Sequence, residues 1–560
     1  MTKHLITSAL PYINGTKHLG NLAGSLLPAD VQARHLRQCG GEVLFVCGTD
    51  EHGTPAEIAA AAAGLTPREF CDREHLRHRE IYEAFGLSFD RFGRTSDPAN
   101  HHLTQKVFLA LEREGFIEER ETRQFWSAVD GRFLPDRYIL GTCPRCGHSD
   151  ARGDQCDACS ATLDPTDLGS PRSAISGAVD LELRATRHLF LRQSALAGEL
   201  VAWLHQRSGW SPFVSSIARG WLAQGLRDRS ITRDLSWGIP VPKPGWEGKV
   251  FYVWFDAPLG YIAASGQDPV SGPSADELAS WWDPEGDIRY IQFLGKDNVP
   301  FHAVSFPCTL LGSRLPIRTV DVIKGFHWLT YEGGKFSTSQ GRGVFLDQAL
   351  EILPADGWRW WLCANSPESS DTDFSFERLA VDLNADLADN LGNFVNRVFK
   401  YISARHGGIV PAEVPRNQEL EAELDVRLSA LREAHDRAEL RRAANEARAI
   451  WSLSNGYVAR SGPWISAKTD PEASKDAAAT AVALVRLCAL TAWPFVPGLA
   501  RTILDAVGEP PGNPRWLGSA KEELACVRAG IAVSVPSVLF EKIDDAWVVA
   551  RRVQFGGTAP

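Results

Sequence analysis

Apolar runs of strand length alternate with helical stretches in the first part of the chain. Residues 4–13 predict a buried strand, and a helix is expected to begin near His18. Pro28 should kink or restart that helix, because proline lacks the N–H that a helix interior needs. Residues 43–47 predict a second buried strand. The order strand, helix, strand is typical of a doubly wound α/β domain, whose ligands lie at the carboxyl ends of the strands.

The alternation stops near residue 119 and returns near residue 231. The stretch between contains a cysteine cluster and short strands, which indicates an insertion. Two later apolar runs, 250–255 and 288–294, predict further strands of the α/β domain. From residue 378 onward, leucines recur at helical spacing. The predicted units are the first half of the α/β domain (1–118), the insertion (119–230), the second half of the α/β domain (231–325), a loop-rich region (326–377), a helical domain (378–530) and a C-terminal tail (531–560).

The composition is that of an ordinary globular protein. Hydrophobic residues make up 44% of the 560-residue chain and charged residues 23%, with a net charge of −10. This acidic balance argues against bulk electrostatic binding of nucleic acid, so any contact with RNA must be local. The N-terminus has no secretory pattern, and the apolar segment 478–494 is too short to span a bilayer. We therefore expect a cytoplasmic protein that does not bind a membrane.

Four of the eleven cysteines cluster between residues 143 and 159. Cys143 and Cys146 form one C-x2-C pair, and Cys156 and Cys159 form another. Two such pairs on tight turns suit a tetrahedral Zn²⁺, and a site closed by four thiolates leaves no position for water. Disulfides are the alternative, which a cytoplasmic protein disfavours. The cluster therefore predicts a structural zinc site.

Two short motifs far apart in the chain carry the strongest chemical signal. They are His18-Leu19-Gly20-Asn21 and Lys335-Phe336-Ser337-Thr338-Ser339. Together they resemble the HIGH and KMSKS motifs with which class I aminoacyl-tRNA synthetases handle ATP. The helix start near His18 offers free N–H groups to a phosphate, and the imidazole can donate to a phosphoryl oxygen as charge builds there. By itself His18 would be a capping or packed histidine, and only the partner motif favours adenylate chemistry.

Further stretches extend the resemblance over most of the chain. They are residues 9–20, 47–54, 133–138, 231–238, 251–260, 295–302, 331–345 and 389–397. In this order they are similar to the methionyl-tRNA synthetase family, in its archaeal- and eukaryotic-like branch. The resemblance implies an α/β Rossmann-type (HUP) catalytic domain with an inserted zinc-knuckle domain, followed by an α-helical anticodon-binding domain. The loop-rich region 326–377 then corresponds to the family's stem-contact region.

The resemblance also implies the reaction, the substrates and the cofactors. L-Methionine would be activated with Mg²⁺-ATP to methionyl-adenylate and then transferred to the 3′ end of tRNA(Met), both initiator and elongator. One structural Zn²⁺ is expected, since residues 170–186 contain no cysteine for the second knuckle that some relatives carry. We expect a monomer.

The resemblance places site residues at numbered positions of this sequence. The catalytic residues would be His18, Asn21, Asp50, Arg233 and Lys335. ATP contacts would come from His18, Gly20, Asn21, Gly295, Asp297, Lys335, Ser337, Thr338 and Ser339. Methionine contacts would come from Ala9, Leu10, Tyr12, Asp50, Trp254, Pro258, Tyr261 and His302. Anticodon contacts would come from Asn393, Arg397 and Trp464.

These residue types suit the chemistry, although each also has a plainer role. A thioether is apolar and polarisable, so aromatic walls suit it, and a carboxylate at a strand end can pair with the substrate ammonium. Trp254 and Tyr261 could instead be core residues. Arg233 could instead form an ion pair with Asp234 or another carboxylate. An aromatic ring such as Trp464 suits stacking on a splayed loop base.

One motif position departs from the family pattern. Thr338 stands where the second lysine of KMSKS is usual, so the loop has lost a cation. Lys335 and Arg342 are the candidates to serve in its place, and we expect an active enzyme with Lys335 as the principal loop cation. The alternatives are a catalytically weakened or inhibitor-resistant paralogue, a tRNA-binding relative without activity, and an enzyme that activates methionine for another acceptor.

Overall fold

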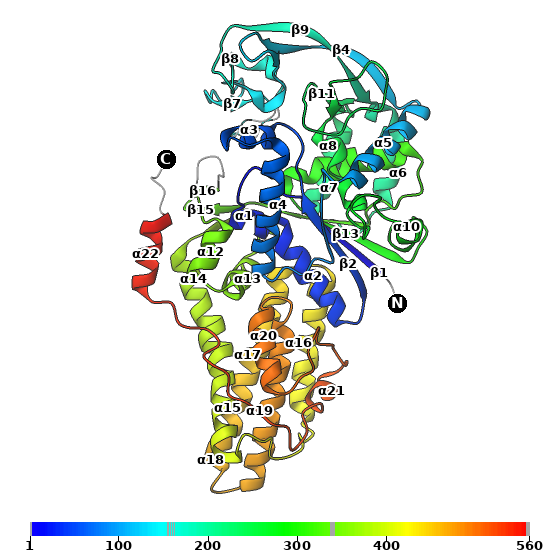
Figure 1. Cartoon of the computed structure of the whole chain (residues 1–560). Helices are drawn as coiled ribbons and strands as arrows, with labels where there is room; N and C mark the ends of the chain where they lie inside the picture. Colours follow the sequence, from blue (N-terminus) through cyan, green and yellow to red (C-terminus); the bar gives the residue numbers. More distant parts are fainter. Residues whose placement is uncertain are drawn as a thin grey trace.

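The structure is a computed structural model that describes residues 3–153, 156, 158–159, 161, 163–336 and 342–555, with the backbone alone at Lys335. A parallel sheet lies in the middle of the molecule, the insertion lies beyond one end of it, and a long helical part extends from the other (Figure 1). No helix in the described part of the chain is long and apolar enough to cross a bilayer.

The central sheet has five parallel strands in the order β14-β13-β1-β2-β3. Their bounds are Lys3–Ser8 for β1, Glu42–Thr49 for β2, Arg91–Arg94 for β3, Ile288–Gly295 for β13 and Val322–Phe326 for β14. The strands predicted at 43–47 and 288–294 are confirmed. The strand predicted at 4–13 is confirmed only for its first half, because β1 ends at Ser8. β2 lies next to β1 on one side within the sheet, and β13 lies next to it on the other side. The strand order therefore reverses between β1 and β13, and a crevice is expected at the carboxyl ends of these two strands.

Alternate residues of the strands pack into two different hydrophobic clusters. Ile6 and Phe45 belong to the cluster that continues into α2 (Leu27–Gln38) and the helical part. Leu5 and Leu44 belong to the cluster on the other face, with α5 (Pro98–Arg113). Both faces of the sheet are therefore covered, as expected for a parallel sheet. The remaining helices of this half are α3 (Thr54–Ala62) and α4 (Pro67–Ala84).

The strand predicted at 250–255 is wrong. Only Val250–Phe251 forms a strand, β12, which pairs with β11 (Thr232–Arg233), and Val253–Asp256 forms the short helix α8. A short apolar run fits a buried helix as well as a strand, and here it is followed by further helical turns at α9 (Gly260–Ala263). The short strand β3 was not predicted, because arginines flank its two central residues.

The insertion is built on two long antiparallel strands, β4 (Ile117–Ser127) and β9 (Leu181–Leu191). The cysteine cluster lies between them, against a small sheet of β6 (Ile139–Thr142), β7 (Ala151–Arg152) and β8 (Gly169–Ser173). The other elements up to β14 are β5 (Arg132–Phe133), α6 (Ala197–His205), α7 (Pro212–Ala223), β10 (Arg229–Ser230), α10 (Ala275–Trp281) and α11 (Phe306–Ser313).

A small sheet and two helices join the catalytic half to the helical part. The sheet contains β15 (Leu329–Tyr331), β16 (Gly334–Lys335) and β17 (Thr372–Phe374), and the helices are α12 (Leu346–Ile352) and α13 (Ala355–Ala364). The helical part contains α14 (Phe376–Leu383), α15 (Asn393–His406), α16 (Gln418–Asp436), α17 (Leu440–Ser461), α18 (Pro463–Ser466), α19 (Pro471–Ala492), α20 (Pro497–Ala506) and α21 (Ala520–Leu524). The predicted tail contains a helix, α22 (Asp545–Phe555), which returns to α14 (Figure 1).

π-Helical segments occur at three places in the described part of the chain. Leu22–Leu26 connects α1 (Leu19–Asn21) to α2, Phe301–Ser305 precedes α11, and Asn384–Gly392 connects α14 to α15. The first segment ends just before Pro28, where the sequence predicted a kink or a restart. The widened turn lies where a proline would otherwise clash with the preceding turn of a regular helix.

Candidate active site

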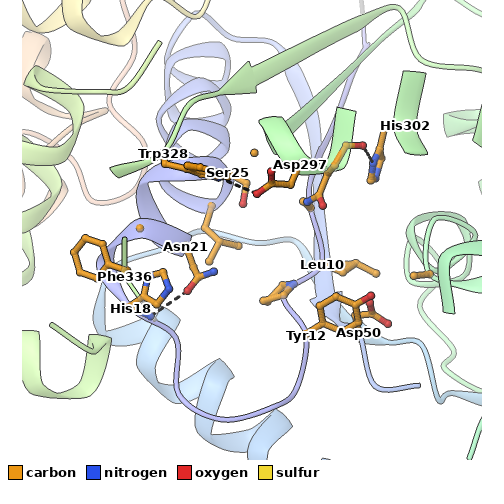
Figure 2. A pocket seen from close by; sticks show the side chains of 18 of the residues that line it. Leu10, Tyr12, His18, Asn21, Ser25, Asp50, Asp297, His302, Trp328 and Phe336 are labelled. Carbon is orange, nitrogen blue, oxygen red and sulfur yellow. Dashed lines mark hydrogen bonds between the residues drawn. The ribbon is translucent and has the colours of Figure 1, made fainter. Parts of the chain in front are cut away.

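A cavity of about 400 Å³ lies at the carboxyl ends of the central strands. Its wall is formed by the residues after β1 and β2, the end of β13, the residues after β14 and the start of the first helix (Figure 2). Of the residues predicted to bind substrates, the cavity brings together Ala9, Leu10, Tyr12, His18, Gly20, Asn21, Asp50, Trp254, Pro258, Tyr261, Gly295, Asp297 and His302. The two predicted subsites therefore form one continuous space.

His18 and Asn21 lie at the first turn of the helix after β1. His18 is the residue before α1, and its backbone N–H donates to Asn21 Oδ1 at 3.1 Å. Burial and the neighbouring Lys17 charge lower the pKa of His18 to about 3, so the imidazole is neutral at physiological pH. Gly20 suits this position, because a Cβ there would lie 3.0 Å from the His18 ring, closer than most Cβ contacts.

Asp50 is a buried carboxylate at the end of β2. Its backbone is fixed by hydrogen bonds from Asp50 N to Pro11 O at 3.0 Å and from Ile13 N to Asp50 O at 2.9 Å. Its Oδ1 has no hydrogen-bond partner among the described residues. Burial raises the pKa of Asp50 well above its usual value, and the Asp256 and Glu51 charges add to the effect. An organic cation beside Asp50 would restore its charged form.

Tyr261 and His302 form a buried hydrogen-bonded pair. The Tyr261 hydroxyl lies 2.9 Å from His302 Nε2, and His302 Nδ1 lies 3.0 Å from the carbonyl oxygen of Asn298. Because a carbonyl only accepts, Nδ1–H donates to it and Nε2 accepts from the tyrosine. Burial lowers the pKa of His302 to about 4, which keeps the ring neutral.

Aromatic rings form the wall beside this pair. Trp254 stacks on Phe301 with ring centroids 3.7 Å apart, and Tyr12 meets the Trp254 ring edge-on at 6.0 Å. Tyr12 and Asp50 are also joined by a parallel β-bridge. The arrangement combines an apolar wall with one buried carboxylate.

The opposite end of the cavity is more polar. Asp297 lies just after β13, and its Oδ2 accepts from Trp328 Nε1 at 2.8 Å (Figure 2). Gly295 ends β13, and His327 and Trp328 follow β14. Lys296 lies over the Trp328 ring at 3.7 Å and pairs with Asp371 at 2.8 Å.

Arg233 does not line this cavity. Its Nε donates to Asp136 Oδ2 at 2.8 Å, and its guanidinium lies 3.7 Å from the centroid of the Tyr252 ring. Asp234, the ion-pair partner first considered for Arg233, instead pairs with Lys249 at 2.6 Å. Arg233 lines a smaller neighbouring space that shares Tyr12 and Trp254 with the main cavity, so the two spaces are adjacent.

Part of the second motif falls outside the described residues. Ser337, Thr338 and Ser339 are not described, and the side chain of Lys335 is not described either. The backbone of Lys335 pairs with Thr330 in the hairpin of β15 and β16.

The cavity also contains residues that the sequence did not assign. Phe336 and Trp328 line it, and so do Gly24 and Ser25 from the first π-helical segment. Lys17, the residue before His18, is almost fully buried outside the cavity lining and donates to Asn14 Oδ1 at 2.6 Å. Burial lowers the pKa of Lys17 to about 7. Its place directly before the first motif was the only sequence signal for it.

The four clustered cysteines converge on one point. All four Sγ atoms lie within 4.8 Å of one another, with Cys143 and Cys159 at 3.9 Å and Cys146 and Cys156 at 3.6 Å. A tetrahedron with Zn–S bonds of about 2.3 Å has S–S edges of about 3.8 Å, so the spacing fits. Cys156 also lines the main cavity. These residues could therefore hold a metal ion beside the cavity.

The predicted anticodon residues lie in the helical part, on α15 and α18. The Arg397 guanidinium lies 5.2 Å from the centroid of the Trp464 ring and donates to Asn455 Oδ1 at 3.0 Å. Trp464 is 36% exposed, so part of its ring is open to solvent. Asn393 lies one turn before Arg397 on α15, is exposed and lines a different groove. The structure therefore brings together Arg397 and Trp464.

Comparisons with known proteins agree with this architecture. A family model described as class I (M) tRNA synthetases matches residues 4–399, and a model of the anticodon-binding domain of methionyl tRNA ligase matches residues 410–560. The chain belongs to the methionyl-tRNA synthetase family. The expected fold class is thereby confirmed, with a parallel Rossmann-like sheet and a helical anticodon-binding domain.

Family members align with the chain over its whole length. A methionine–tRNA ligase of Dinoroseobacter shibae is 52% identical and covers 100% of both chains. Methionine–tRNA ligase 1 of Acaryochloris marina is 51% identical and covers 99% of this chain and 100% of its own. These relatives are bacterial, so they do not support the expected archaeal- and eukaryotic-like branch. The structure of a Mycobacterium tuberculosis methionyl-tRNA synthetase in complex with methionyl-adenylate is 25% identical, has a TM-score of 0.77 and covers 96% of this chain and 100% of its own.

Proposed function

We propose that the protein joins L-methionine to tRNA(Met), initiator and elongator, through methionyl-adenylate. The observation that carries this proposal is the cavity itself. The buried Asp50 carboxylate lies beside its aromatic wall, and the cavity extends from there to the helix start at His18. A cation-binding group, an apolar wall and a phosphate-binding helix start are the three features that the reaction needs.

Methionine would bind at the aromatic end of the cavity. Its ammonium would pair with Asp50, whose Oδ1 has no partner among the described residues. Its thioether would lie against Trp254 and near the Tyr261 hydroxyl, which His302 holds in place. Ala9, Leu10, Tyr12 and Pro258 would complete the pocket.

ATP would bind at the polar end. The start of α1, with Gly20 and Asn21, would receive phosphate, and Asp297 would accept from the ribose. His18 would donate to the α-phosphate as charge builds during attack by the methionine carboxylate. Because the imidazole of His18 is neutral, its N–H would donate a hydrogen bond to the phosphate and keep the proton. Mg²⁺ would enter with ATP, and Lys335, Ser337, Thr338 and Ser339 would act from the second motif.

Arg233 has a separate role in this proposal. It lies behind Tyr12 and Trp254 with its charge balanced by Asp136, so it would act on the cavity wall rather than on a phosphate. Arg397 and Trp464 would receive an anticodon base by stacking, with Asn393 reading a base edge.

The cysteine cluster would hold one structural Zn²⁺. Four thiolates at tetrahedral spacing satisfy the metal completely, so the ion would stabilise the knuckle and take no part in the reaction. The domain bounds predicted from the sequence, a cytoplasmic location and a monomeric state belong to the same proposal.

The alternatives fit the cavity less well. A relative that only binds tRNA needs no buried carboxylate in an aromatic pocket, and an enzyme acting on another acceptor needs no Arg397–Trp464 pair. Full-length identity of about 51% to methionine–tRNA ligases also favours the complete reaction.

One experiment separates these functions. ATP–pyrophosphate exchange is measured with each amino acid, and purified initiator and elongator tRNA(Met) are then charged. Methionine-dependent exchange together with charging is expected. Exchange without charging would indicate another acceptor, and the absence of both would indicate a binding protein.

A further inference from the structure

Phe336, the second residue of the KFSTS motif, lies against the His18 imidazole. The ring centroids are 4.9 Å apart and the planes are inclined by 21°, an offset stack (Figure 2). Methionine is the usual residue at this motif position, and its flexible side chain could not present a flat face to the histidine. The two motifs are therefore joined through one aromatic contact.

The backbone makes room for the Phe336 ring. A Cβ atom at Gly343 would lie 2.1 Å from the ring, and the φ of Gly343, +114°, is one that glycine adopts most easily. At Gly20, the absence of a side chain lets the Phe336 ring and the His18 imidazole stay in contact. His18 also pairs with Phe345 through an antiparallel β-bridge, which fixes the backbone next to the stack.

Tyr331 also packs against Phe336. The two ring centroids are 5.6 Å apart, and Tyr331 itself is only 1% exposed. Its hydroxyl donates to the backbone carbonyl of Phe555 at 2.9 Å, at the end of α22. The Phe555 ring in turn packs on Phe376 of α14. The C-terminal helix thus holds Tyr331, and Tyr331 holds Phe336.

A histidine that acts at a precise place is usually oriented by a hydrogen bond to one ring nitrogen. His18 Nδ1 is buried and has no hydrogen-bond partner among the described residues. The orientation of the imidazole therefore depends on what packs against its faces. Phe336 covers one face, and Gly20 permits the close approach on the helix side.

We propose that Phe336 is the positioning residue of His18, and that its stacked ring takes the place of the usual orienting hydrogen bond. This inference rests on the proposed function, since it assigns His18 to the activation of ATP. The stack holds the imidazole in the geometry that meets the α-phosphate in the transition state. Loss of the stack lowers kcat for activation and leaves the methionine site unchanged.

The first test measures the stack without any activity. Diethyl pyrocarbonate modifies accessible neutral imidazoles, and mass spectrometry gives the rate at the His18 peptide. Phe336→Leu is expected to raise that rate severalfold in the protein without ligands, whereas Phe399→Leu, a matched change in α15, leaves it unchanged. An unchanged rate at His18 in Phe336→Leu overturns the stack, whatever the protein catalyses.

The second test measures the consequence in methionine-dependent pyrophosphate exchange. Phe336→Leu is expected to lower kcat about tenfold, with methionine KM within twofold of the parent value. The loss should disappear in a His18→Asn background, and Phe336→Tyr, which keeps the ring, should restore most of the rate. An equal loss in both backgrounds means that Phe336 does not act through His18. A parent protein without exchange would instead contradict the proposed function, and the modification rates would still decide the stack.

Discussion

The guanidinium of Arg359 donates to the Asp30 carboxylate across 2.7 Å, and neither side chain is exposed to solvent. Arg34 provides the same carboxylate with a second cation at 2.8 Å. Arg359 also donates to the carbonyl oxygens of Phe495, at 2.7 Å, and Pro494, at 3.0 Å. One buried side chain in α13 therefore joins α2 of the catalytic half to the turn before α20.

Removing Arg359 should destabilise the whole protein. Arg359→Ala leaves a buried carboxylate with one cation fewer and removes the donor of the carbonyl groups that Arg359 binds, so the free energy of unfolding should fall by about 3–5 kcal/mol. Urea denaturation followed by tryptophan fluorescence measures the change. Lys475→Ala breaks an exposed pair with Glu472 and should cost under about 1 kcal/mol. Similar decreases in the free energy of unfolding of the two variants would show that the buried pair contributes no more than the exposed one.

Methionine binding should release a proton from Asp50. Burial raises the pKa of Asp50 in the empty cavity, whereas a bound ammonium favours its charged form. Methionine affinity should therefore increase as the pH rises through that pKa. Calorimetry in two buffers with different protonation enthalpies measures the proton directly. Asp268→Asn, which changes an exposed carboxylate outside the cavity, should keep the proton release, and Asp50→Asn should abolish it.

The same pKa shift has a consequence for stability. A carboxyl whose pKa is raised on folding binds more protons in the folded state, so its contribution to stability falls as the pH rises above the unfolded value. Asp50→Asn should therefore make the empty protein more stable at neutral pH while preventing methionine binding. A thermal melt showing a lower midpoint for this variant would contradict the assignment.

Removing the metal should affect the cavity as well as the knuckle. Cys156 belongs both to the cysteine cluster and to the cavity wall. A strong chelator, or Cys146→Ser, should reduce the zinc content from about one ion per chain and lower methionine-dependent exchange. Cys39→Ser, at an exposed cysteine outside the cluster, should retain both. Full exchange activity in metal-free protein would show that the knuckle and the cavity are independent.

Trp464 should affect charging without affecting activation. Stacking of a base on an aromatic ring is worth about 1–3 kcal/mol, so Trp464→Ala should raise the KM for tRNA(Met) roughly tenfold to a hundredfold. Pyrophosphate exchange should remain at the parent rate, because the ring lies in the helical part. Ile465→Ala changes the next residue, 73% exposed, and should leave charging intact. Equal effects on exchange and charging would indicate a folding defect instead.

Lys335 should be the principal cation of the second motif. Arg342, the other candidate, donates to the carbonyl oxygens of Tyr331, at 3.1 Å, and Glu332, at 3.3 Å, which holds it on the hairpin. Lys335→Ala should lower exchange about a hundredfold, and Thr338→Lys should raise it. Arg342→Lys, which preserves the charge, serves as the control with a smaller effect. Unchanged exchange in Lys335→Ala would show that another group contacts the phosphates.

The sequence predicted the parts of this protein that depend on local pattern. The apolar runs at β1, β2 and β13 were long enough to identify strands, and paired cysteines define a tetrahedral site by spacing alone. The run at 250–255 was misassigned because its apolar character fits a helix equally well. The π-helical segments were not predicted, since their residues fit an ordinary helical pattern.

Contacts between distant segments could not be predicted in the same way. Arg233 pairs with Asp136, 97 residues earlier in the chain, although Asp234 is its sequence neighbour. The stack of Phe336 on His18 depends on the glycine turn at 343 and on the return of the C-terminal helix. Such contacts arise from the folded arrangement of several elements, and a single sequence contains no direct signal for them.

The π-helical segment Leu22–Leu26 determines how the residues of α2 are oriented relative to the cavity residues at the start of the same helix. Asn21, just before the segment, and Ser25, within it, line the cavity. Asp30, which follows the segment, binds Arg359. Each residue of a regular helix advances the chain by about 100°, so a deletion of one residue here would turn the following helix by that angle. Asp30 would then point away from its partners while His18 stayed in place. The extra residue of this π-helical segment therefore fixes the direction in which Asp30 points, and alignments of related sequences should show no gap in this turn.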